Sequence, residues 1–142
     1  MRINDTLPED LHRQGKWYQG RSVQLGKPLL IVFWSVSCDS CSVAMRQLSK
    51  LQNNFSDTQI LLIHTPLVDE DNDLNIIRNK SSQFNVIASK IADMDDNLSQ
   101  LFRVKYVPAF YLFDQERKLR FSQSGKSNTS LLENKIARLY RR

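Results

Sequence analysis

Apolar runs and helix-like spacings alternate along the first half of the chain. Residues 29–34 read Leu-Leu-Ile-Val-Phe-Trp, a continuous apolar run that predicts a strand buried on both faces. Apolar positions between residues 43 and 55 recur at helical intervals, so we expect a helix that ends near residue 54. Residues 60–63 predict a second buried strand.

The second half of the chain continues this alternation. Residues 73–84 have helical spacing after an acidic first turn, which suits the helix dipole. Residues 86–93 predict a short strand, and residues 96–102 predict a short helix. Residues 109–113 form a third apolar run, and residues 118–123 alternate as an antiparallel edge strand does.

Each end of the chain adds one more element. Trp17 and Tyr18 suit a short strand that packs against the body, and Asn128 or Thr129 caps a final helix. The resulting order of strands and helices predicts an α/β fold. We expect a three-layer sandwich, with a mixed central sheet and helices on both of its faces.

Length and composition fit one globular domain. A chain of 142 residues can bury a sizeable core, and its hydrophobic share of 41% and charged share of 25% are ordinary. The sequence has no internal repeat or low-complexity tract. We expect a single domain over residues 1–142, with its core at about 26–142 and an N-terminal extension at 1–25.

The net charge of +5 raises the question of nucleic-acid binding. Eight of the 20 basic residues lie from position 117 onward, and no basic stretch is interleaved with aromatic residues as a stacking platform requires. We interpret the basic C-terminal part as a solvated face and expect no nucleic-acid partner. Mildly basic character can still steer an acidic partner protein toward the surface.

No segment of the sequence predicts a membrane span. The N-terminus lacks the apolar stretch of a secretory signal, and the longest apolar run, residues 28–34, is too short to cross a bilayer. We therefore expect a cytoplasmic location for the chain as written. If an N-terminal anchor or signal was removed, the expected location is extracytoplasmic.

The two cysteines, Cys38 and Cys41, follow the first buried strand and precede the first helix. Free backbone N–H groups and the helix dipole favour a thiolate on the first of them. The second lies about one turn later, close enough to attack a mixed disulfide formed on the first. We expect Cys38 to be the nucleophile and Cys41 the resolving thiol, with no cofactor other than their redox-active disulfide.

Two other interpretations compete with redox chemistry. A zinc site needs two further N or S ligands, and only His12 and His64 are available, so we expect no metal. Two inert buried thiols are a more common alternative, because cysteine packs well as a small apolar residue. The order of strand, motif and helix favours the redox interpretation. We expect His64 to be a capping or packing residue.

The residues around the motif resemble a known family. Residues 29–41 resemble the active-site strand and helix start of the thioredoxin superfamily, and residues 106–110 resemble its second hallmark, a cis proline that faces the disulfide. The resemblance implies a thioredoxin-like fold and a substrate-binding surface beside the two cysteines. The residues it assigns to that surface are Trp34, Ser37, Asp39, Ser40, Val107 and Pro108.

The number of residues between the two-cysteine motif and the proline indicates which branch of the superfamily the chain resembles. Cys41 and Pro108 are 67 positions apart, and the extra helix and strand around residues 66–92 are similar to the insertion of the TlpA/ResA-like thiol–disulfide oxidoreductases. Peroxiredoxins share this insertion but carry a Thr and a Pro upstream of one peroxidatic cysteine. Trp34 and Ser35 occupy those positions here, which disfavours peroxidase activity.

The motif departs from the family pattern at three places. Ser37 stands where many relatives carry Trp, and Val32 stands where thioredoxin has a buried acid. Asp69 or Glu70 is a candidate to replace that acid, although solvent exposure is the more common fate. Asp39 beside the nucleophile opposes formation of the thiolate, which favours a more reducing couple.

We expect a thiol–disulfide oxidoreductase that exchanges disulfides with a protein substrate and acts as a reductant. Its partners are a protein thiol or disulfide and an upstream redox donor, and we expect a monomer. The alternative is a thioredoxin-like protein-binding module with weak or no redox activity, in which the two cysteines are vestigial.

Overall fold

The computed structural model describes residues 1–24 and 26–141. Its strands are β1 (Lys16–Gln19), β2 (Leu29–Trp34), β3 (Gln59–His64), β4 (Ser89–Ala92), β5 (Ala109–Phe113) and β6 (Leu119–Ser124). Its α-helices are α1 (Asp39–Asn54), α2 (Leu74–Ser82), α3 (Asn97–Phe102) and α4 (Ser130–Tyr140). Two short 3-10 turns are η1 (Leu11–Arg13) and η2 (Asp69–Asp71).

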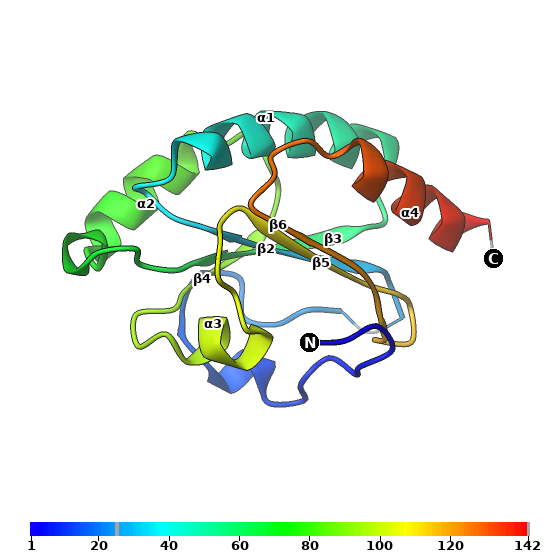
Figure 1. Ribbon diagram of the computed structural model, residues 1–142, viewed down its shortest axis with the longest axis horizontal. Helices are drawn as coiled ribbons and strands as arrows, with labels where there is room; N and C mark the ends of the chain where they lie inside the picture. Colours follow the sequence, from blue (N-terminus) through cyan, green and yellow to red (C-terminus); the bar gives the residue numbers. More distant parts are fainter. Residues whose placement is uncertain (25, 142) are drawn as a thin grey trace.

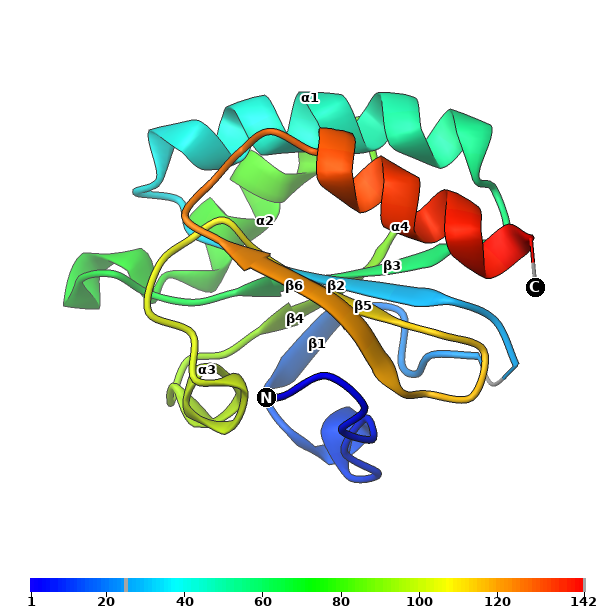
Figure 2. The ribbon, with the colours of Figure 1, turned by 45° about the vertical axis from the view of Figure 1, so that its right-hand side comes forward.

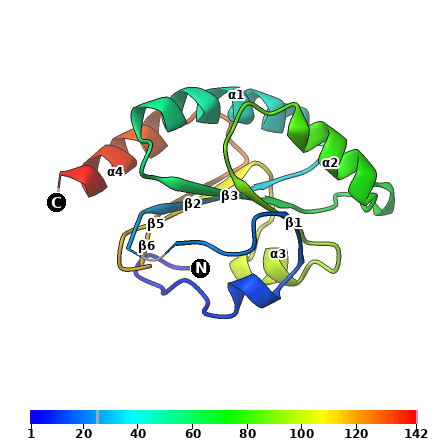
Figure 3. The same cartoon turned by 180° about the vertical axis from the view of Figure 1, so that it is seen from behind.

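The strands form one mixed sheet in the order β1-β4-β3-β2-β5-β6. The strands β2, β3 and β4 run parallel, while β5, β6 and β1 are antiparallel to their neighbours. Helices α1, α2 and α4 cover one face of the sheet, and α3 with the N-terminal segment covers the other (Figures 1 and 3). The predicted three-layer α/β sandwich is confirmed.

Each face of the sheet carries its own apolar core. Leu30, Val32 and Trp34 of β2 point toward the core under α1, α2 and α4, whereas Ile31 and Phe33 point toward the core under α3. This division follows from the alternation of side chains along a strand. It explains why the run 29–34 is apolar at every position.

The N-terminal segment is an integral part of the fold. Thr6 forms an isolated antiparallel bridge with Lys118, and the N–H of Leu7 donates to the carbonyl of Arg117 at 2.9 Å. Leu7 and Leu11 are buried in the core under α3. Figure 2 shows this segment beneath β5 and β6. The expected N-terminal extension therefore packs on the sheet, and its Trp17-Tyr18 pair lies in β1.

The predicted elements are all present, with shifts of a few residues at their ends. The largest shift concerns α1, which begins at Asp39, ahead of the apolar positions that predicted it. The extra helix and strand expected around residues 66–92 are α2 and β4. Thr129 is the N-cap of α4 but makes no capping bond, and Asn128 Oδ1 accepts the N–H of Ser130 at 2.8 Å instead.

Within the described residues no helix is both long and apolar enough to cross a membrane.

The aromatic cluster under α3 generates a stability prediction. Phe102 is 1% exposed, and its ring centroid lies 5.3 Å from that of Phe33 and 5.1 Å from that of Tyr111. Phe102→Ala leaves a cavity in this core, so we expect the free energy of unfolding to fall by about 3–5 kcal/mol. Denaturant unfolding measures the loss, with Phe102→Leu as the milder control. A loss below about 1 kcal/mol in Phe102→Ala, well outside that range, would contradict the packing described here.

Candidate active site

The two cysteines lie at the junction of β2 and α1 and form a disulfide. Cys38 is the N-cap of α1, and its Sγ accepts the backbone N–H of Cys41 at 3.2 Å. Cys41 is 1% exposed, whereas Cys38 is partly exposed. Cys38 is therefore the sulfur that a partner can reach, and it lies at the positive end of the helix dipole.

The segment before β5 faces the disulfide. The carbonyl oxygen of Val107 lies 3.7 Å from Cys38 Sγ, and the peptide bond between Val107 and Pro108 is cis. Pairing of β5 with both neighbouring strands begins only at Ala109, so the backbone of Val107 lies outside the ladder. Tyr106 is 67% exposed beside it. This edge is open to an approaching chain.

A buried carboxylate lies behind the segment that leads into the redox motif. Asp71, which is 4% exposed, accepts hydrogen bonds from the hydroxyls of Ser35, at 3.2 Å, and of Ser37. It also accepts the backbone N–H groups of Leu67 and Val68, at 2.8 and 3.2 Å. One side chain thus connects the loop after β3 to the residues immediately before the nucleophile.

His64 fixes the residue between the two serines. It is the last residue of β3 and is fully buried, and its Nε2 accepts the N–H of Val36 at 3.2 Å. Its ring packs edge-on against Trp34, with centroids 4.9 Å apart, and Trp34 packs in the same way against Phe84. Since Nε2 accepts, the neutral ring carries its proton on Nδ1. That atom has no hydrogen-bond partner in the described part of the chain.

Burial and hydrogen bonding shift the pKa values of these two groups. Burial lowers the pKa of His64 to about 4, against a smaller opposite effect of the Asp71 charge. Burial by itself raises the pKa of Asp71, but its four hydrogen bonds outweigh that effect and hold the pKa below its ordinary value. At neutral pH the site therefore contains a neutral imidazole and a buried carboxylate.

The predicted site residues separate into an exposed and a buried set. Ser37, Asp39 and Ser40 are exposed around Cys38, and Ser40 Oγ lies 3.4 Å from its Sγ. Trp34 is fully buried behind the motif, so its ring offers no surface to a substrate, contrary to our expectation. Among residues 1–24 and 26–141 no group of three or more His, Cys, Asp or Glu side chains is placed to hold a metal ion.

Sequence reasoning missed the roles of Asp71 and His64. The acids proposed to replace the missing one, Asp69 and Glu70, are exposed, and the neighbouring Asp71 turns inward. Nothing in the acidic run distinguishes one carboxylate from the next, because the 3-10 turn η2 decides which side chain points to the motif. His64 is a packing residue as predicted, but it also accepts a hydrogen bond from the motif segment.

Comparisons with known proteins agree with this geometry. The sequence pattern of the AhpC/TSA family matches residues 5–122. The chain belongs to the AhpC/TSA family. It is similar to the thiol-disulfide oxidoreductase YkuV of Bacillus subtilis (strain 168), with 32% identity over 144 residues that cover 98% of this chain and 97% of that protein.

Solved structures show the same fold. A thioredoxin-like protein in its oxidised form superposes with a TM-score of 0.84 at 30% identity, covering 99% of this chain and 98% of the other. StoA from Bacillus subtilis has a TM-score of 0.67 at 13% identity, covering 86% and 93% of the two chains. The predicted resemblance to the thioredoxin superfamily and the predicted class, thiol–disulfide oxidoreductase, are confirmed.

The buried His64 predicts how stability depends on pH. The unfolded chain protonates this residue near pH 6.5 and the folded protein only near pH 4, so folding stability is full above about 6.5 and is lost as the pH falls toward 4. We expect the loss to be about 3 kcal/mol. His64→Gln keeps an acceptor for Val36 but does not titrate, so its unfolding free energy should change less between pH 7 and 4. Equal pH dependence of the two proteins would contradict the assignment.

The buried carboxylate predicts unequal effects of two neighbouring substitutions. Asp71→Ala removes the acceptor of two hydroxyls and two backbone amides, and we expect a loss on the order of 3 kcal/mol in unfolding free energy at pH 7. Asp69→Ala, in the same turn but exposed, should change it by less than about 0.5 kcal/mol. Chemical denaturation compares the two variants. A similar loss of unfolding free energy in both variants would contradict the prediction, because the hydrogen bonds of Asp71 would then not account for the difference that we expect.

Proposed function

We propose that this chain reduces disulfides in protein substrates, with Cys38 as nucleophile and Cys41 as resolving thiol. The observation that carries the proposal is the unequal exposure of two sulfurs at the start of one helix. A partner can reach the first sulfur, and only the protein itself can reach the second.

The reaction consists of two exchanges. The thiolate of Cys38 attacks one sulfur of the substrate disulfide, the substrate S–S bond breaks, and the other substrate sulfur leaves as a thiolate that takes a proton. The thiol of Cys41 then loses its proton and attacks Cys38 Sγ, which releases the second substrate thiol. Two electrons pass to the substrate, and the protein keeps the Cys38–Cys41 disulfide until an upstream dithiol donor reduces it.

The open backbone at Val107 supports a protein as substrate. An extended segment can pair with an unpaired strand edge through main-chain hydrogen bonds, which need no particular side chain. Val107 presents such an edge 3.7 Å from the nucleophilic sulfur. Ser37, Asp39 and Ser40 complete the proposed contact surface around it, whereas Pro108, which we also expected on this surface, is buried.

The surrounding charges support the direction of electron flow. The N–H of Cys41 and the helix dipole stabilise a thiolate on Cys38. Asp39 beside it and the carboxylate of Asp71, bonded to Ser37, act against that thiolate. A less stable reduced thiolate makes the couple more reducing. We therefore propose a reductant whose role requires a compartment that keeps dithiols reduced, such as the cytosol.

Substitution of the two cysteines separates their roles. In an insulin-reduction assay with dithiothreitol, we expect Cys38→Ser to lose the catalysed rate, since no reachable thiol remains. Cys41→Ser should also lose turnover, but it should accumulate a mixed disulfide through Cys38, which mass spectrometry detects. Equal rates for wild type and Cys38→Ser would remove the enzymatic function and leave a binding module.

The reduction potential of the Cys38–Cys41 couple tests the proposed direction of electron transfer, from the protein to its substrate. We expect the Cys38–Cys41 couple to equilibrate with glutathione or dithiothreitol buffers near the thioredoxin value of about −270 mV. Asp39→Asn removes one opposing charge, so its potential should be less negative than that of the wild type. A wild-type value near the roughly −120 mV of a strong oxidant would reverse the proposed direction while leaving the exchange chemistry in place.

A further inference from the structure

A basic groove begins directly beside the redox motif. It has a volume of about 550 Å³ and lies between α1 and the segment that ends α2. Ser42, the residue after Cys41, lines one end of the groove, and the buried Met45 and half-buried Phe84 provide an apolar floor. The groove thus starts where a substrate bound at the disulfide would lie.

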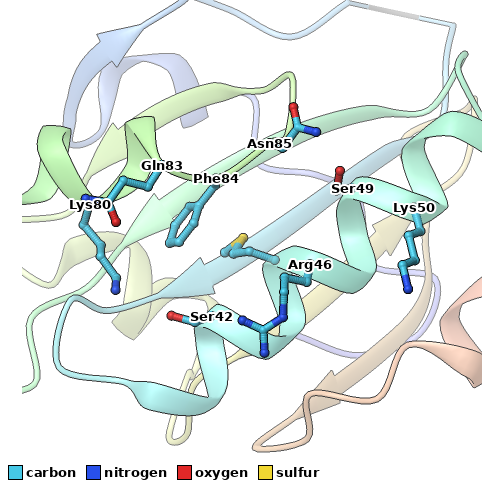
Figure 4. A pocket seen from close by; sticks show the side chains of 9 residues that line it. Ser42, Arg46, Ser49, Lys50, Lys80, Gln83, Phe84 and Asn85 are labelled. Atoms are coloured by element: carbon cyan, nitrogen blue, oxygen red, sulfur yellow. The ribbon is translucent and has the colours of Figure 1, made fainter.

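The α1 side of the groove is a single helical stripe. Ser42, Arg46 and Lys50 follow one another at intervals of four residues, which places them on one face of α1. Figure 4 shows Arg46 and Lys50 projecting from successive turns of α1, while Lys80 reaches from α2 toward the start of α1. Three cations therefore line one groove, and none of its lining residues is Asp or Glu.

These three cations have no ion pair within the described chain. The ion pair found among residues 1–24 and 26–141 joins Arg120 to Asp114, away from the groove. Arg46 and Lys50 stand four apart on one helix, an arrangement of like charges that slightly destabilises it. Neither lies in the last turn of α1, where a cation would complement the dipole. Lys80 does lie in the last turn of α2, where its charge complements the helix dipole. Of the three cations, Lys80 is therefore the one whose position the helix itself explains.

We propose that this groove, formed by Ser42, Arg46, Lys50 and Lys80, binds an acidic segment of the protein whose disulfide is exchanged at Cys38. The proposal rests on the proposed function and names the chemistry of its partner. From Ser42 to Lys50 the helix rises about 12 Å, which about four residues of extended chain can span. The acidic side chains of the partner should therefore lie within about four residues of its reactive cysteine.

Two matched peptides test the proposal. Each contains one cysteine held as a mixed disulfide with 2-mercaptoethanol, flanked on both sides by four Glu in one peptide and four Gln in the other. The readout is the ratio of the two rate constants for reduction by the reduced protein. At low ionic strength we expect the wild type to prefer the acidic peptide by roughly tenfold, and 0.5 M NaCl should reduce this preference.

Two double variants with the same change of net charge provide the comparison. Arg46→Glu with Lys50→Glu should bring the ratio to about one or below. Arg13→Glu with Lys16→Glu changes exposed residues of η1 and β1, away from α1, and should keep most of the preference. Thermal unfolding of both variants checks that they are folded.

The outcomes distinguish the groove from the proposed function. Failure of the wild type to reduce either peptide would remove the proposed function itself. Reduction of both peptides at equal rates would leave that function intact and overturn the groove. An equal loss of preference in the two double variants would also overturn it, because net charge would then account for the selectivity.

Discussion

The enclosure of β2 is the constraint on which the rest of the structure depends. All six of its side chains are at most 3% exposed, and a strand can be enclosed in this way only with neighbours on both edges and covering layers on both faces. The strands β3 and β5 pair with the two edges of β2, and the helices cover the two faces of the sheet, as Figure 1 shows. Three residues separate the end of this strand from the redox motif, so the disulfide is attached closely to a strand that is enclosed on both edges and both faces. Loops on such scaffolds are common positions for reactive residues.

Buried polar side chains hold the short segment between β2 and the redox motif. His64 and Asp71 together accept hydrogen bonds from Ser35, Val36 and Ser37, the three residues between β2 and Cys38. Unpaired polar groups at this depth would be costly, and here most of them have partners. The short junction therefore has its own set of fixed contacts, in addition to the apolar packing of β2. Two buried side chains, the neutral imidazole of His64 and the charged carboxylate of Asp71, therefore hold the segment that leads to the reactive sulfur of Cys38.

The sequence predicted the architecture because the architecture depends on apolar periodicity, which is local. The run 29–34 and the motif after it were sufficient to place the disulfide at the end of a central strand. The inward turn of Asp71 could not be predicted, because it depends on a 3-10 turn whose three acidic residues look alike in sequence. Trp34 was assigned to the substrate surface by family resemblance, yet it is enclosed by His64 and Phe84. Both errors concern which way a side chain points, and long-range packing decides that.

The contact between the N-terminal segment and the residue before β6 has a consequence for folding during synthesis. Thr6 and Lys118 are 112 positions apart, and they are joined by a backbone bridge and by a side-chain hydrogen bond of 2.6 Å. The core under α3 therefore stays open on one side until β6 has been translated. Loop closure over such a distance is slow compared with helix formation. On the ribosome, the nascent chain should hold its N-terminal residues unpaired for most of translation, so the core under α3 closes only after the β5–β6 hairpin has emerged.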